Sequence, residues 1–229
     1  MEPIQQFQIF LLLPMRKIIL AIIFFIFFLL LPFIVLIRMA VFTHEHFNLH
    51  PWVSIGVAVF ATSLLLVIYF SAIHWRFKGK LGKAKSFKRR TLFMLSLVMI
   101  FAFNGLFYLS NSNTKNKDIQ KEFREIHPVL RLAVSTLIWA DKDLVITDAY
   151  RIPEDYKKMN LPTKKHSLHY SQKDGYVYAI DIRTLNRSGL VNFLVESYFK
   201  LMGFNTLLHG GTATHLHVSL SCPYRPGSI

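Results

Sequence analysis

The chain has one cysteine, Cys222, and only 13 acidic residues against 27 lysines and arginines. A single cysteine excludes a disulfide framework and a cysteine-rich zinc site. The acids are also unevenly spread, because the first 110 residues carry 2 Asp/Glu with 11 Lys/Arg, whereas the remainder carries 11 with 16. The net charge of +14 therefore describes a basic, apolar N-terminal section joined to a mildly basic polar domain.

Several signatures of function are absent as well. The basic residues lie beside apolar runs and not among stacking aromatic residues, which argues against a nucleic-acid partner. The sequence has no glycine-rich phosphate loop and no nucleophile elbow for Ser-His-Asp catalysis. The long apolar runs contain no charged residue, so a small transporter or channel subunit is a disfavoured interpretation.

Three apolar runs, at about 18–37, 52–73 and 92–109, are long enough to cross the hydrocarbon core of a bilayer. Pro32 in the first run is tolerated in a membrane helix, because neighbouring groups satisfy the freed carbonyl. The first run is longer than that of a signal peptide, and no small-residue cleavage site follows it. We therefore predict a retained membrane anchor of three transmembrane helices over residues 1–110.

The loop at 75–90 holds eight Lys/Arg and no acid, and a short loop of this composition stays in the cytoplasm. Arg16 and Lys17, just before the first span, place the N-terminus on the same side. The loop at 38–51 and the C-terminal domain are then expected on the outer side of the membrane. The histidines of this outer loop, from His44 onward, do not form an HExxH motif and are interpreted as solvated.

After a polar linker at 111–118, residues 119–229 have the mixed pattern of a small α+β domain. Ser188 and Gly203 are typical of the start and the end of a helix. The domain is long enough to bury its own core. The pattern predicts an antiparallel sheet with flanking helices, with helices over 119–137 (interrupted at Pro128) and 189–202, and strands at 144–147, 176–182, 205–208 and 215–220.

Histidines and one aspartate carry the chemistry of this domain. Alternate side chains of a strand share a face, so His215 and His217 lie together, opposite apolar residues. Asp181 interrupts an apolar strand, and a buried carboxylate is costly unless it is paired or binds a cation. His169 precedes this aspartate, and His209 precedes the His-x-His pair. Two of these four histidines together with the aspartate would make a catalytic zinc set, and a structural or incidental His-x-His is the alternative.

Four blocks stand out between residues 143 and 220: Val145–Arg151, Ser167–Tyr170, Ala179–Ile182 and His215–Ser219. Together they resemble the shared core of the D-alanyl-D-alanine metallopeptidases and the Hedgehog signalling domain. The pattern of that superfamily is Ser-x-His-x-x-Gly-x-Ala-x-Asp-Ile, followed by a distant His-x-His. The resemblance implies the same fold for the C-terminal domain.

The resemblance further implies one zinc ion held by His169, Asp181 and His217, with His215 beside the metal. Arg151 would bind a carboxylate or carbonyl of the substrate. The implied activity is hydrolysis of peptide bonds involving D-amino acids in peptidoglycan, as a carboxypeptidase or an endopeptidase. The partners are then peptidoglycan stem peptides and the lipid bilayer. The protein is expected in the bacterial cytoplasmic (inner) membrane, with its C-terminal domain on the periplasmic, extracytoplasmic side.

The spacing departs from the family pattern at one point. Eleven residues separate His169 from Asp181, which is longer than the family interval. We interpret the segment 172–176 as an inserted hairpin tip. Asp174 is the alternative ligand, although it lacks the Ala-x-Asp-Ile context.

A second departure concerns catalysis. Many members of the family carry a Glu shortly before the last histidine, and the corresponding positions here are Thr214 and Gly211. The general base is therefore open between His209 and His215. The alternative function is a non-catalytic, zinc-containing module of the same fold that binds wall peptide or a protein partner.

Overall fold

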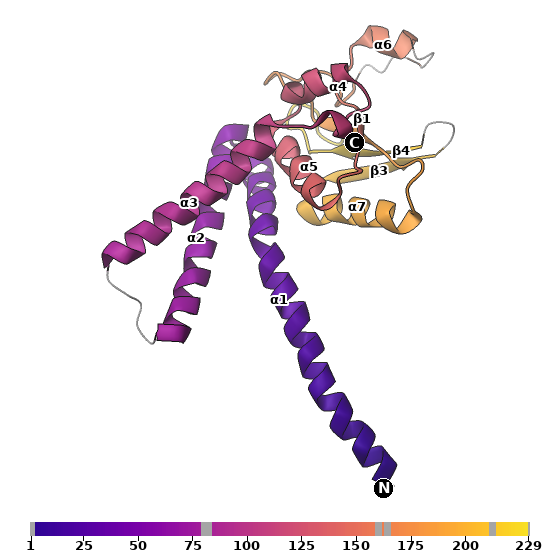
Figure 1. The fold of residues 1–229 in the computed structure, drawn as a ribbon. Helices are drawn as coiled ribbons and strands as arrows, with labels where there is room; N and C mark the ends of the chain where they lie inside the picture. Colours follow the sequence, from indigo (N-terminus) through magenta and orange to yellow (C-terminus); the bar gives the residue numbers. More distant parts are fainter. Residues whose placement is uncertain (1–2, 79–83, 159–161, 163–165, 211–213, 229) are drawn as a thin grey trace.

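The computed structural model of the chain describes residues 3–78, 84–158, 162, 166–210 and 214–228. Within these residues the protein has three long helices followed by a small α+β domain with a four-stranded antiparallel sheet (Figure 1). The long helices are α1 (Pro3–Phe47), α2 (Pro51–Lys78) and α3 (Ala84–Phe107). The domain contains η1 (Asn111–Asn113), α4 (Lys117–Glu122), η2 (Phe123–Glu125), α5 (Pro128–Ala140), β1 (Ile146–Asp148), α6 (Pro153–Lys158), β2 (Ala179–Arg183), α7 (Gly189–Met202), β3 (Asn205–His209) and β4 (His215–Ser219).

The three predicted spans coincide with helices that are long and apolar enough to cross a membrane, over Met15–Phe47, Pro51–Phe77 and Phe87–Phe107. Large apolar side chains cover the outside of these helices, as expected for surfaces that face lipid. Pro32 does not end α1, which continues through Phe47. The helices therefore extend beyond the uncharged runs from which the spans were predicted.

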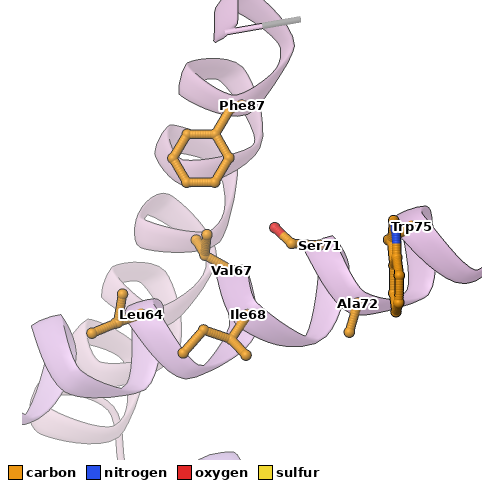
Figure 2. A pocket seen from close by; sticks show the side chains of 7 residues that line it. All are labelled: Leu64, Val67, Ile68, Ser71, Ala72, Trp75 and Phe87. Atoms are coloured by element: carbon orange, nitrogen blue, oxygen red, sulfur yellow. The ribbon is translucent and has the colours of Figure 1, made fainter. Parts of the chain in front are cut away.

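Helices α2 and α3 diverge as they leave the domain (Figure 1). An apolar groove opens between them, to which α3 contributes one aromatic ring and α2 the remaining side chains (Figure 2). Among the described lining residues the polar side-chain atoms are one hydroxyl and one indole nitrogen, so this lining suits lipid chains. The lining residues are Leu64, Val67, Ile68, Ser71, Ala72, Trp75 and Phe87.

The end of α1 packs against the domain, and this corrects the interpretation of its histidines as solvated. His44 is buried, its Nδ1 lies 2.9 Å from the carbonyl oxygen of Leu49, and its ring centroid is 4.5 Å from that of His127. Nδ1 of His127 in turn accepts the N–H of Val129 at the start of α5. Burial, with the nearby charges of His44 and Arg131, holds the pKa of His127 well below its usual value.

The polar linker is also part of the packed structure. The Asn113 side chain is buried, and its Nδ2 donates to the carbonyl oxygens of Lys142 at 2.9 Å and Leu144 at 2.8 Å. Thr114 forms a bridge with Ile146 of β1. Side chains of α1, α2, α3 and the domain belong to one continuous buried core. The chain therefore passes from the membrane helices into the domain without a free spacer.

The sheet has the strand order β1-β2-β4-β3, with every neighbouring pair antiparallel. Ile180 and Ile182 of β2, with Leu216 and Val218 of β4, are buried in the core that includes Phe199 of α7. Alternate residues face the other way. The helices thus cover one face of the sheet and leave Asp181, His215 and His217 on the opposite face.

Helix α7 begins and ends where the sequence predicts. The Ser188 Oγ accepts the N–H of Val191 at 3.2 Å and so caps the first turn. Gly203 follows the last turn with φ +97°, a conformation that strongly favours glycine. These two caps fix the connection between β2 and β3 and therefore the position of the His-x-His strand beside β2.

Candidate metal centre

Three ligand atoms converge on the face of the sheet opposite α7. The Nε2 of His169 lies 3.2 Å from Nδ1 of His217 and 3.4 Å from Oδ1 of Asp181. The Nδ1 of His217 lies 2.9 Å from the same carboxylate oxygen. All three side chains are buried. Among the described residues, these three form the group that is able to hold a metal ion.

The sheet and one loop bring these residues together. Asp181 and His217 are direct cross-strand partners in β2 and β4, so their side chains leave the same face. His169 comes from the loop before β2. Its N–H donates to Ser167 Oγ at 3.2 Å, and its carbonyl accepts the N–H of Arg151 at 3.0 Å. The loop backbone is therefore held at the point where the imidazole meets the sheet.

One hydrogen bond fixes the tautomer of His169. Its Nδ1 is 2.7 Å from the carbonyl oxygen of Ala149. A carbonyl oxygen only accepts, so Nδ1 carries the proton and the lone pair of Nε2 points into the cluster. That lone pair faces Oδ1 of Asp181, which is a second acceptor. Two acceptors at this distance repel unless a cation or a proton lies between them, and this favours a metal site.

The triangle of ligand atoms has the size that a zinc site requires. Zinc with tetrahedral bonds of about 2.0–2.1 Å places its ligand atoms about 3.3 Å apart. The observed separations of 3.2, 3.4 and 2.9 Å lie close to this value. The donor set of two imidazoles and one carboxylate fits zinc, with a fourth position for water or substrate.

The electrostatics of the cluster keep Asp181 ionised. Burial alone would raise the pKa of this carboxyl group. The contacts of the carboxylate with His169 and His217 and the charge of Arg151 outweigh burial and hold the pKa well below its usual range. A metal ligand must be deprotonated to bind, so Asp181 is ready to act as one.

Arg151 lies at the outer side of this carboxylate. Its Nη2 donates to Oδ2 of Asp181 at 2.6 Å, and its Nε donates to Oδ2 of Asp148 at 2.8 Å. Its guanidinium carbon is 5.5 Å from the centre of the Tyr156 ring. Burial would lower the pKa of Arg151, but the charges of Asp148 and Asp181 raise it above its usual value. The guanidinium thus holds Oδ2, while Oδ1 faces the histidines.

Asp148 is the residue of this site to which the sequence analysis gave no role. A register shift in β1 pairs Ile146 with Ile182 but Asp148 with Asp181, so the bulged strand turns Asp148 toward the cluster. The available signal was its position three residues before Arg151, a spacing at which opposite charges can pair. The carbonyl of Ala149, which orients His169, left no signal in the sequence.

His215 and His209 lie beside the three ligand atoms. His215 Nε2 is 3.6 Å from Asp181 Oδ2, and its side chain is 26% exposed. The ring of His209 stacks on that of His215, with centroids 4.8 Å apart, and is 6.1 Å from the ring of His217. His215 is therefore the nearer and partly solvent-accessible neighbour of the cluster, and His209 lies behind it.

The alternative ligand Asp174 is placed elsewhere. Its carboxylate accepts the hydroxyl of Tyr178 at 2.6 Å and the N–H of Tyr176 at 3.2 Å. The loop around it closes like a hairpin tip, because the N–H of Gln172 donates to the carbonyl of Tyr176 at 2.9 Å. Gly175 in this tip has φ +83°. The extra residues between His169 and the aspartate therefore form a turn that leaves Asp181 beside the histidines.

Of the two positions at which family members carry a Glu, Thr214 is half-buried, and Gly211 lies outside the described residues. Comparison with known proteins adds no further assignment: no family model, no curated protein and no solved structure matches the chain. The interpretation of the site consequently rests on its geometry and on the sequence blocks that led to it.

Proposed function

We propose that the chain is a membrane-anchored zinc metallopeptidase that hydrolyses peptide bonds involving D-amino acids in peptidoglycan. The observation that carries this proposal is the buried triangle of His169 Nε2, Asp181 Oδ1 and His217 Nδ1, which has the size and donor set of a zinc site. The four sequence blocks that resemble the D-alanyl-D-alanine metallopeptidases contribute the three ligand residues and Arg151. We propose the same fold family for the domain on these grounds.

Zinc in such a site supplies Lewis-acid chemistry that polarises a carbonyl and makes water a nucleophile near neutral pH. The chain's own residues have separate tasks around it. Ala149 and Arg151 orient His169 and Asp181. His215, 3.6 Å from Asp181 and partly exposed, is in position to carry a proton between the attacking water and the leaving amine.

We assign two roles to Arg151, and they are separable. Peptidoglycan stems end in a free carboxylate, for which a guanidinium is the best bidentate partner. The same guanidinium already pairs with Asp148 and Asp181, which supports a second role in holding the metal-binding carboxylate. The first role acts on substrate, the second on metal affinity.

Arg151→Lys is expected to lower cleavage of stem peptides by about 100-fold, because the ammonium group of lysine cannot reproduce the bidentate hydrogen bonding of a guanidinium. Zinc content at saturating zinc should stay normal. Steady-state rates and metal analysis of the same preparation measure both quantities. A variant that keeps its rate at saturating zinc but needs more zinc to reach it would assign Arg151 to the carboxylate alone.

The basic loop between α2 and α3 supports a domain outside the cytoplasm, where peptidoglycan lies. A C-terminal alkaline phosphatase fusion is therefore expected to be active, and a fusion within the loop 76–90 inactive. Reporter activities in intact cells test this orientation. Activity of a cytoplasmic reporter fused to the C-terminus would show the opposite orientation. The domain would then lie on the side of the membrane without peptidoglycan.

The second candidate is a module that binds wall peptide without cutting it, and the absent Glu favours it. Digestion of isolated peptidoglycan by the purified, zinc-loaded full chain separates the two. The peptidase is expected to release trimmed or uncross-linked stem peptides, and chelation of zinc should abolish their release. If the chain stays bound to intact peptidoglycan and no new fragments appear, the proposed function is the binding module and not the enzyme.

A further inference from the structure

Helix α7 carries large apolar side chains that the protein does not cover. Leu190, Phe193, Leu194 and Leu201 are each between 56% and 68% exposed. Positions 190, 194 and 201 are separated by about one and two helical turns, so these leucines form one stripe along α7. An exposed apolar stripe of this kind on a surface helix indicates a contact with something apolar.

The stripe is distinct from both other sides of the helix. Val195 and Phe199 face the core of the domain. On another side the exposed Lys200 forms an ion pair of 2.6 Å with the half-buried Glu196. Helix α7 therefore has a core side, a polar side and an exposed apolar side, and only the first two have partners within the described part of the chain.

The position of α7 points to lipid as the partner. Gly203, directly after α7, packs on α1 so closely that a Cβ there would clash with Arg38 and lie 3.1 Å from Val41. Arg38 is the residue at which the uncharged run of the first span ends. Figure 1 shows α7 at the lower edge of the domain, beside α1, on the side toward which the three long helices run. The stripe thus lies where α1 leaves the hydrocarbon core.

Helix α5 provides a second contact at the same level. Trp139 near its end is 59% exposed, and its ring centroid is 6.3 Å from that of Phe101 in α3. Phe101 packs at 5.3 Å on Phe33, inside the first span. The Nζ of Lys142 lies 4.8 Å from the centre of the Trp139 ring. Tryptophan with a neighbouring lysine is typical of the boundary between acyl chains and headgroups.

We propose that α7 is an interfacial helix whose apolar stripe, with Trp139, enters the headgroup and acyl boundary of the leaflet on which the domain lies. Its occupant is the lipid bilayer, continuous with the lipid around α1 and α3. The Lys200–Glu196 side faces water. Because α7 covers the core face of the sheet, this anchoring turns the face with Asp181 and His217 away from the bilayer. The inference requires only that α1–α3 span a membrane, and not the proposed chemistry.

Site-specific labels in the full chain test this anchoring. An environment-sensitive fluorophore is attached to Leu194→Cys or Leu201→Cys, with Glu196→Cys on the polar side of the same helix as the matched control. Cys222 is replaced by alanine, and each chain is placed alone in a nanodisc whose lipids carry a quencher close to the headgroup. Emission at 194 and 201 is expected to shift to the blue and to be quenched, while emission at 196 is not.

A second measurement needs no cysteine. In a chain with Trp52→Phe and Trp75→Phe, the remaining Trp139 is expected to be quenched by brominated lipids. Equal, quencher-independent emission at all three labelled positions, or an unquenched Trp139, would overturn the proposal. The same labels are also measured in discs that hold two chains. A blue shift at 194 and 201 that appears only in these discs would also overturn the proposal, in favour of a second copy as the occupant.

Discussion

His217→Ala is expected to remove nearly all bound zinc from the chain, while His215→Ala, on the same face of β4, is expected to leave most of it. Nδ1 of His217 is one of three ligand atoms in a triangle of 2.9–3.4 Å, whereas His215 contacts the outer oxygen of Asp181. Loss of a supporting residue costs about 10–100-fold in metal affinity, and loss of a ligand costs more. Metal analysis of the dialysed full-length protein measures the difference.

The two variants are matched controls for each other, because they remove the same side chain from one face of one strand. Both should remain folded, since Leu216 and Val218 keep the core side of β4 intact. Equal zinc loss from both variants would mean that the strand, and not the ligand atom, determines binding. Full zinc retention in His217→Ala would remove His217 from the metal site.

The second large effect concerns the missing Glu. His215→Ala is expected to lower kcat by about 10²–10⁴-fold when measured at saturating zinc, the range for loss of a general acid or base. His215 is preferred over His209 because its Nε2 is 3.6 Å from Asp181 and its side chain reaches solvent. The ring of His209 stacks on that of His215 and is 6.1 Å from that of His217, without the approach to Asp181 that His215 makes, so His209→Ala should cost less.

The pH dependence of kcat distinguishes a proton carrier from a structural residue. Loss of the His215 imidazole should remove one limb of the profile measured on stem peptides, and a merely structural role would lower the rate at every pH. If His215→Ala has a normal rate and a normal pH profile, His209 becomes the candidate proton carrier. If both alanine variants cut at the wild-type rate, neither histidine carries the proton.

The sequence predicts those parts of the fold that depend on local patterns. Helix α7 lies at 189–202 as expected, because Ser188 and Gly203 cap it on either side. The spans follow from uninterrupted apolar runs, although the helices continue past them. Strand β1 is displaced toward Asp148, because a bulge shifts its pairing with β2 and short strands carry little periodic signal.

Strand alternation and the position of Asp181 in an apolar strand indicated a metal site, but the choice of His169, Asp181 and His217 as its ligands came from the family resemblance. The surroundings of the site depend on contacts between distant segments. Nothing in the sequence of residues 145–151 shows that the carbonyl of Ala149 meets His169 or that Arg151 lies between two carboxylates. Likewise, the sequence around His44 is typical of a solvated loop, whereas in the structure His44 belongs to α1 and packs on His127.

Zinc titration of the metal-free full-length protein, with cleavage of a stem peptide followed at each addition, tests the central claim most directly. The ligand triangle predicts that cleavage rises with added zinc and stops rising at one zinc per chain, and that His217→Ala shows no such rise. Cleavage that is independent of zinc, or a chain that binds one zinc and leaves the peptide uncut, would contradict the proposed metallopeptidase.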